Sequence, residues 1–190
     1  MIFIKDEEFI RGDCPMTKEE VRILSVAKLE LQEDHEVLDI GAGTGSVSIQ
    51  ISKICIKGKV IAIEKDTEAL KILYKNKEKF KVGNLIVIEG EALEKESAIE
   101  EKFDSIFIGG SGGNLEDLIR KYSLKLKNNG NMVLNFITID NLYKGMSTLK
   151  ALNYSTECIQ VAISKTKGEG YMLFSNNSIF ILSGRKKVGK

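Results

Sequence analysis

The chain has 190 residues, of which 43% are hydrophobic and 29% charged, so it is long enough for one well-packed domain and short for two. Its formal net charge of +1 provides no broad field for attracting nucleic acid or an anionic membrane surface. No apolar run approaches the roughly 20 residues of a membrane-spanning helix, and the acidic stretch at 6–8 is unlike a secretion signal. We therefore expect a cytoplasmic protein whose cysteines, at 14, 55 and 158, form neither disulfides nor a metal site.

Strand-like apolar segments alternate with helix-like segments along most of the chain, which is typical of βαβ units and a mostly parallel sheet. A capping box at 17–20 predicts the start of a first helix that runs to about Leu31. The predicted strands are 36–40, 59–64, 85–89, 103–108, 131–137, about 154–164 and about 171–183. The predicted helices between them are about 46–54, 67–80, 115–126 and 142–152.

The last two predicted strands are joined by a glycine-containing link at 165–170. This link is too short for a crossover helix, so the two strands should pair antiparallel. We expect a single domain over 1–190, with an amino-terminal segment and its helix at 1–35, a nucleotide-binding core at 36–184, and a solvated basic tail at 185–190.

The most informative segment is the glycine turn Gly41-Ala42-Gly43-Thr44-Gly45, which follows the first strand. Three glycines at alternate positions let the chain bend sharply from strand into helix, and they let a ligand lie against backbone N–H groups. The dinucleotide fingerprint G-x-G-x-x-G requires a glycine at position 46, which is Ser46 here. The spacing therefore favours a nucleoside without pyrophosphate, such as S-adenosylmethionine (SAM), over a nicotinamide cofactor.

Residues at the ends of the next two strands support this interpretation. Glu64 ends the second strand about 20 residues beyond the turn, where a carboxylate can accept hydrogen bonds from both ribose hydroxyls. The alternative for Glu64 is a solvated acid before a helix that Asp66 caps. Glu91 and Ala92 follow the third strand, where the adenine would sit. The pattern predicts an α/β, class I SAM-dependent methyltransferase with a Rossmann-like sheet of seven strands, mostly parallel, with an antiparallel last strand.

The chain resembles the cobalt-precorrin-6B C15-methyltransferases (decarboxylating) of anaerobic cobalamin biosynthesis over nearly its whole length. The resemblance rests on residues 6–9 together with residues 15–20, on the glycine turn through Ser48, and on the stretch Ile108-Gly109-Gly110-Ser111-Gly112-Gly113. One residue departs from the family pattern: Glu91 stands where this family usually has Asp. It implies methyl transfer from SAM to C15 of a corrin precursor, with loss of carbon dioxide from the C12 acetate. The cofactor contacts that it implies are Thr17, Gly41, Ala42, Gly43, Thr44, Gly45, Glu64 and Ala92.

Loops at the carboxyl edge of the sheet are the expected place for the substrate. Glycines there would let a flat macrocycle approach the backbone, and basic side chains would meet its carboxylates, although a solvated charge is the alternative for each of them. The predicted substrate-binding residues are Arg11, Gly110, Ser111, Gly112, Asn135, Lys165 and Lys167. No catalytic base is identified, because the only histidine, His35, precedes the first strand at the opposite edge.

Two other functions remain open from the residues alone. One is methylation of RNA or protein by the same fold, although aromatic residues make up only 7% of the chain and Trp is absent. The other is a non-catalytic cofactor-binding subunit. We also expect self-association as a dimer or tetramer, through the amino-terminal segment or the last pair of strands.

Overall fold

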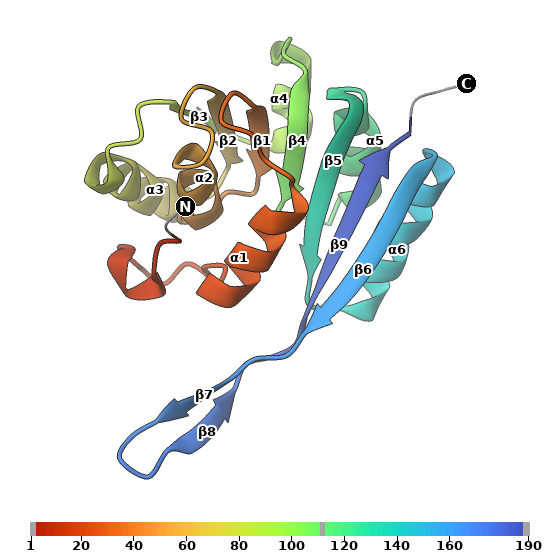
Figure 1. The fold of residues 1–190 in the computed structure, drawn as a ribbon. Helices are drawn as coiled ribbons and strands as arrows, with labels where there is room; N and C mark the ends of the chain where they lie inside the picture. Colours follow the sequence, from red (N-terminus) through yellow and green to blue (C-terminus); the bar gives the residue numbers. More distant parts are fainter. Residues whose placement is uncertain (1–2, 111–112, 188–190) are drawn as a thin grey trace.

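The computed structural model describes residues 3–110 and 113–187. Its main sheet has seven strands in the order β3-β2-β1-β4-β5-β9-β6, and a two-stranded sheet, β7-β8, extends from the body as an arm (Figure 1). The strands are β1 (Glu36–Ile40), β2 (Lys59–Glu64), β3 (Leu85–Glu89), β4 (Phe103–Ile108), β5 (Leu126–Phe136), β6 (Tyr154–Val161), β7 (Ser164–Lys167), β8 (Met172–Ser175) and β9 (Ile179–Lys186). The helices are α1 (Glu19–Lys28), α2 (Ser46–Ser52), α3 (Thr67–Phe80), α4 (Ala92–Lys95), α5 (Leu115–Ser123) and α6 (Ile139–Ala151), with 3₁₀ turns at η1 (Asp6–Glu8) and η2 (Glu96–Ala98).

Helices cover both faces of the main sheet (Figure 1). Helices α1, α2 and α3 enclose one core with Val37 of β1, while α4, α5 and α6 enclose the other with Leu38 and Ile40 of the same strand. Because alternate side chains enter opposite cores, the central parallel strands are almost continuously apolar, as predicted. None of the helices in the described ranges is long and apolar enough to cross a membrane.

Strand β9 lies between β5 and β6 and runs antiparallel to both. Leu182 of β9 pairs with Leu134 on one side and with Cys158 on the other. The five strands from β3 to β5 are parallel to one another. This arrangement confirms the predicted fold class, including the antiparallel last strand.

The β7-β8 arm (residues 164–175) corrects the predicted ends of the last two strands. Strand β6 stops at Val161 and β9 starts at Ile179, later than the predicted 171. Two residues separate β6 from β7 whereas three, 176–178, separate β8 from β9, so the arm is out of register with the main sheet by one residue. The predicted glycine link therefore turns an independent hairpin, with Gly168 at φ 70°.

Other element boundaries also differ from the predictions. The N-cap of α1 is Lys18 and carries no side-chain cap bond, so the predicted capping box at Thr17 does not form. Helix α5 ends at Ser123, before the predicted residue 126. The predicted turn at 128–130 instead lies inside β5. There the pairing of β5 with β4 shifts in register, and Asn129 has a φ of 62°.

The end of the chain continues further into the sheet than predicted. Arg185 and Lys186, the first residues of the predicted solvated tail, belong to β9. The Arg185 guanidinium pairs with the Glu30 carboxylate at 2.8 Å, and the Lys186 ammonium donates to the Leu126 carbonyl at 3.0 Å. Residues 188–190 of that tail lie outside the described residues.

Buried polar side chains hold the amino-terminal segment against α1, α2 and α3. The Arg22 guanidinium, fully buried on α1, donates to the carbonyls of Ile4 and Thr17 and pairs with Asp6 at 3.0 Å. The Asn76 amide of α3 bonds both the N–H and the carbonyl of Ile10. These contacts fix residues 13–18 as a wall above the carboxyl edge of the sheet.

Candidate active site

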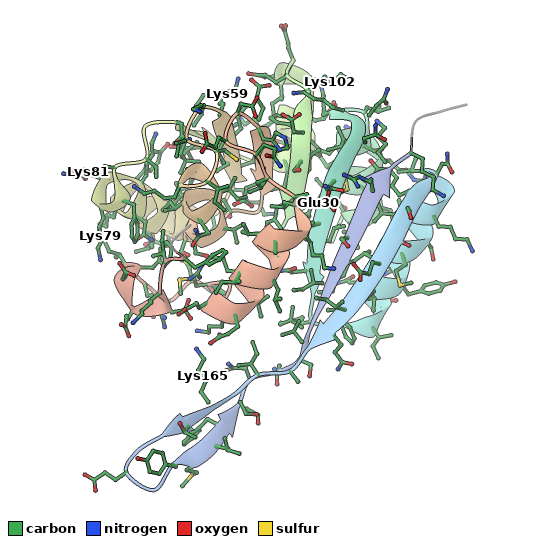
Figure 2. The ribbon with its side chains drawn as sticks, viewed as in Figure 1. Glu30, Lys59, Lys79, Lys81, Lys102 and Lys165 are labelled. Atoms are coloured by element: carbon green, nitrogen blue, oxygen red, sulfur yellow. The ribbon has the colours of Figure 1, made fainter. Side chains whose placement is uncertain are left out.

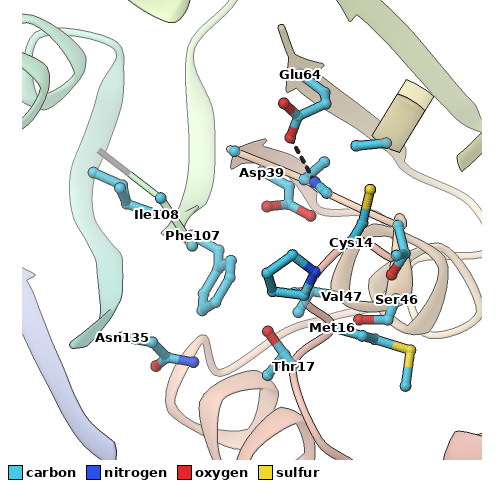
Figure 3. Close-up of a pocket in the computed structure, with 18 of the residues that line it drawn as sticks. Cys14, Met16, Thr17, Asp39, Ser46, Val47, Glu64, Phe107, Ile108 and Asn135 are labelled. Atoms are coloured by element: carbon cyan, nitrogen blue, oxygen red, sulfur yellow. Dashed lines mark hydrogen bonds between the residues drawn. The ribbon is translucent and has the colours of Figure 1, made fainter. Parts of the chain in front are cut away.

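A cleft of about 750 Å³ lies at the carboxyl edge of the sheet (Figure 3). One wall is the amino-terminal segment at 13–18, and the floor is formed by the ends of β1, β2, β4 and β5. The carboxyl ends of parallel strands are the usual ligand site of open α/β sheets, and the volume lies within the usual range for small-molecule sites. The cleft is therefore the candidate active site.

The glycines of the predicted turn are in a left-handed conformation, and residues 41–44 of the turn line this cleft. Gly41, Gly43 and Gly45 have φ values of 71°, 56° and 80°. A Cβ atom on Gly41 would lie 2.8 Å from the backbone nitrogen of Gly110, so only glycine fits between β1 and the loop after β4. The N–H groups of Gly41 and Ala42 both donate to the Ile63 carbonyl. At these two residues the turn offers a ligand close approach instead of the free donors that we expected.

The Glu64 carboxylate is buried at the end of β2 and turns toward the glycine turn. Its Oε2 accepts from the Gly43 N–H at 2.6 Å, the dashed line in Figure 3, and its Oε1 accepts from the N–H groups of Lys65 and Asp66. A carboxylate has about four acceptor positions, so the three N–H groups leave capacity for a ligand donor. Because Glu64 is buried, the alternative of a solvated acid does not hold for it. Asp66 caps α3 as predicted, because its side chain accepts a hydrogen bond from the Ala69 N–H.

Asp39 is an acidic residue of the cleft to which sequence reasoning assigned no role. It is fully buried, its Oδ2 accepts from the Ser48 hydroxyl, and its Oδ1 has no hydrogen-bond partner among the described residues. Burial raises the pKa of the Asp39 carboxyl to about 7, and the negative charge of Glu64 acts in the same direction. The available signal was an acidic residue inside an otherwise apolar strand, Val37-Leu38-Asp39-Ile40.

A second cavity of about 170 Å³ adjoins the cleft and shares Gly41, Glu64 and Gly110 with it. Ala92 lines this smaller cavity, next to Glu91, whose carboxylate pairs with the Lys65 ammonium at 2.7 Å. The predicted cofactor residues thus divide between two adjoining spaces. Thr17 and the turn from Gly41 to Thr44 line the larger one, Ala92 lines the smaller one, and Gly45 lines neither.

The predicted substrate residues are only partly brought together. Gly110 and Asn135 line the cleft, while Ser111 and Gly112 lie outside the described residues. Contrary to expectation, Arg11 and Lys165 are not among the residues that line the cleft.

Both basic side chains have acidic partners elsewhere. Arg11 pairs with Asp6 at 3.6 Å. Lys165, at the base of the arm in Figure 2, pairs with Glu20 of α1 at 2.5 Å. Lys165 and Lys167 belong to β7, because the predicted loop leaves the body as the arm.

Apolar side chains that sequence reasoning missed line the part of the cleft away from Glu64. They come from the amino-terminal wall, from α1 and from the ends of β4, β5 and β9, and they are Met16, Val21, Phe107, Phe136, Ile137 and Ile179. Within the described residues, no group of three or more His, Cys, Asp or Glu side chains is placed to hold a metal ion.

The residues of the cleft fit SAM. The sulfonium and the ammonium of SAM are cationic, and the cleft places the carboxylates of Asp39 and Glu64 beside a turn that admits close approach. The adjoining smaller cavity, which Glu64 also lines, adds a separate space, as a nucleobase attached to a bound ribose requires.

Comparison with known proteins identifies the family. Residues 8–179 match the model of the precorrin methyltransferase domain. The chain belongs to this family. A precorrin methyltransferase relative from Sulfurisphaera tokodaii, named probable cobalt-precorrin-6B C(15)-methyltransferase (decarboxylating), is 44% identical over 187 residues, which cover 96% of this chain and 97% of the relative.

Solved structures agree with this membership. A precorrin-6y C5,15-methyltransferase from Geobacter metallireducens has a TM-score of 0.93 and 38% identity, with 98% of this chain and 97% of that chain covered. A protein from Methanobacterium thermoautotrophicum described as precorrin 8W decarboxylase has a TM-score of 0.90 and 27% identity, with 95% and 98% covered. The predicted resemblance, the methyltransferase class and the SAM cofactor are confirmed for this precorrin methyltransferase.

Proposed function

We propose that this precorrin methyltransferase methylates C15 of cobalt-precorrin-6B and removes the carboxyl group of the C12 acetate as carbon dioxide, which leaves a methyl group at C12. The observation that carries the proposal is 44% identity, over nearly the full length of both chains, to a relative with that name. A cleft with an acidic part beside the glycine turn and an apolar part beside β5 supports it, because two ligands of different character must meet there. The names of the relatives favour a corrin precursor over RNA or a protein substrate.

The chain's own residues would hold the cofactor in the acidic part of the cleft. SAM bound there supplies an electrophilic methyl group. Glu64 would accept from the ribose hydroxyls, Asp39 would face the cationic end, and Ala92 would contact the adenine from the smaller cavity. Thr17 closes the cleft from the amino-terminal wall.

The apolar part of the cleft would hold the macrocycle. Met16, Phe107 and Ile179 give this part of the cleft an apolar lining, which suits a conjugated ring system and excludes water. Rate acceleration would come mainly from aligning the two ligands, since a well-oriented pair reacts with an effective molarity of about 10⁵ M or more.

The proposal is tested by the mass of the product. Purified protein, cobalt-precorrin-6B and SAM are incubated together, and the corrinoid is expected to gain one methyl group and lose one carbon dioxide. Methyl gain alone contradicts the decarboxylation. An unchanged corrinoid with the purified protein, and turnover only after a second protein is added, would support a non-catalytic subunit instead.

We also propose that the protein self-associates through the β7-β8 arm, in a reducing cytosol. The arm exposes Tyr171, Met172 and Leu173, and a two-stranded hairpin alone is only marginally stable in water. The amino-terminal segment is the weaker candidate, because Arg22 and Asn76 already anchor it to the body. The free thiols of all three cysteines suit a reducing compartment.

A further inference from the structure

The side chain of Asn135 lies at the carboxyl end of β5, in the wall of the cleft. A fully buried hydroxyl fixes its orientation: Ser25 Oγ on α1 donates to Asn135 Oδ1 at 3.0 Å. Because the amide carbonyl accepts this bond, the amide nitrogen is the group left to face the cleft. In Figure 3 that nitrogen turns toward the space between Phe107 and Thr17.

The amide nitrogen of Asn135 is a buried donor without an acceptor. It is shielded from solvent, and it has no hydrogen-bond partner within residues 3–110 and 113–187. Buried polar groups in folded proteins almost always have a partner, so this unpartnered donor beside the cleft indicates an acceptor on the ligand.

The strand order places this donor on the substrate side of the cleft. Glu64 ends β2, and Asn135 lies three strands away on β5, across β1 and β4. Neighbouring strands are about 4.8 Å apart, so the two side chains start about 14 Å apart. A nucleoside whose ribose lies at Glu64 therefore keeps its sugar and base well away from Asn135.

We propose that Asn135 binds a carboxylate oxygen of the corrin precursor, and that Ser25 is the positioning residue that keeps the amide N–H turned toward it. This inference rests on the proposed function, which supplies a substrate with several carboxylates. Arg11 and Lys165, the basic residues expected in this role, are paired with Asp6 and Glu20. A neutral donor on a rigid strand then orients the substrate, and the hydrogen bond from the Ser25 hydroxyl holds the amide carbonyl on the side away from the substrate.

The test compares the Michaelis constant for cobalt-precorrin-6B with the dissociation constant for SAM. Asn135→Asp places a carboxylate against the substrate's carboxylate and is expected to raise the substrate KM at least tenfold. Ser25→Ala frees the amide to rotate and is expected to raise the substrate KM three- to tenfold, whereas Ser25→Thr keeps a hydroxyl and restores most of it. SAM affinity, measured by calorimetry, should stay within twofold in all three variants.

Ser105→Ala is the matched control. Ser105 is also a buried serine with one side-chain hydrogen bond, to the Leu29 carbonyl at 2.8 Å, and it is not among the residues that line the cleft. This variant should lower the melting temperature about as much as Ser25→Ala while leaving the substrate KM unchanged.

Two results would overturn the inference. Equal substrate KM values for Ser25→Ala and Ser105→Ala would show that the hydroxyl of Ser25 is merely structural. Weaker SAM binding by Asn135→Asp would assign the amide to the cofactor. Both results differ from failure of the proposed function, in which the unaltered protein binds SAM but does not convert the corrinoid.

Discussion

The carboxylate of Glu64 links three parts of the site at once. It accepts the N–H of Gly43 in the glycine turn and those of Lys65 and Asp66 at the start of the α3 segment, and it lines both cavities. An amide in its place has one acceptor oxygen instead of two, and its NH₂ group would face backbone N–H donors. The residue therefore shapes the turn as well as the proposed ribose contact.

Glu64→Gln is expected to weaken SAM binding about 10- to 100-fold, because hydrogen bonds to a charged group contribute about 1.5–3 kcal/mol each. Calorimetric titration with SAM measures the change. Glu89→Gln is the control: Glu89 ends the neighbouring strand β3, bonds the Tyr74 hydroxyl at 2.8 Å and is not among the lining residues of either cavity. Equal affinities of the two variants for SAM would remove Glu64 from the cofactor site.

Among the elements, the β7-β8 arm contributes least to the body of the protein. The main sheet holds β6 and β9 together through eight residue pairs, from Tyr154 with Lys186 to Val161 with Ile179. The arm pairs only with itself, although Lys165 ties its base to Glu20 of α1. The arm can therefore be removed with little loss of packing in the two cores.

Replacing residues 162–178 by an Asn-Gly turn should leave a folded protein and abolish self-association. Asn-Gly suits a two-residue hairpin between antiparallel strands such as β6 and β9. Light scattering coupled to gel filtration gives the molar mass, and circular dichroism gives the retained structure. A second variant, with Met172→Asp and Leu173→Asp, keeps the arm but places an acidic residue on each of its two exposed faces, and it should also be monomeric. An unaltered protein that is already monomeric at micromolar concentration contradicts the proposed role of the arm.

At the scale of the whole molecule, Asp39 couples folding to pH. Burial raises the pKa of its carboxyl from 3.8 to about 7, so between these values the folded protein binds a proton that the unfolded chain releases. The stability that comes from this proton is fully present below about pH 4 and is lost as the pH rises through 7. Carboxyls whose pKa is lowered in the folded protein, such as that of Asp104, have the opposite effect on the free energy of unfolding. Their contribution to stability is lost only as the pH falls below about 4.

The free energy of unfolding should therefore fall between pH 5 and pH 8 by about 3 kcal/mol at most, since one pKa unit corresponds to about 1.4 kcal/mol. Urea titrations at several pH values measure it. Asp39→Asn keeps an acceptor for the Ser48 hydroxyl and removes the titration, so its stability should change less over the same range. Parallel pH profiles of the two proteins would show that Asp39 does not titrate in this window.

How far the sequence predicts this molecule depends on the range of the interactions involved. The limits of β1 to β4 and of α3 match the predictions to the residue, because these strands are mostly apolar runs that end at polar residues or glycine. The arm was not anticipated, because a one-residue difference in register separates it from the main sheet and the same alternation of side chains fits either sheet.

Within the site, local signals predicted the glycine turn and Glu64, which lie within about 25 residues of each other. The hydroxyl that orients Asn135 comes from Ser25, 110 positions earlier in the chain. The partners of Arg11 and Lys165 likewise depend on where their side chains lie after folding. Sequence patterns identify the residue types at this edge, and tertiary structure decides which of them are already paired.

The position of β9 has a consequence for how the chain is made. The ribosome makes β9 after both β5 and β6, yet β9 lies between these two strands in the sheet. Until synthesis reaches Ile179, those two strands have no neighbour in common and present open hydrogen-bonding edges. A stop codon just before Ile179 would thus delete an interior strand of the sheet.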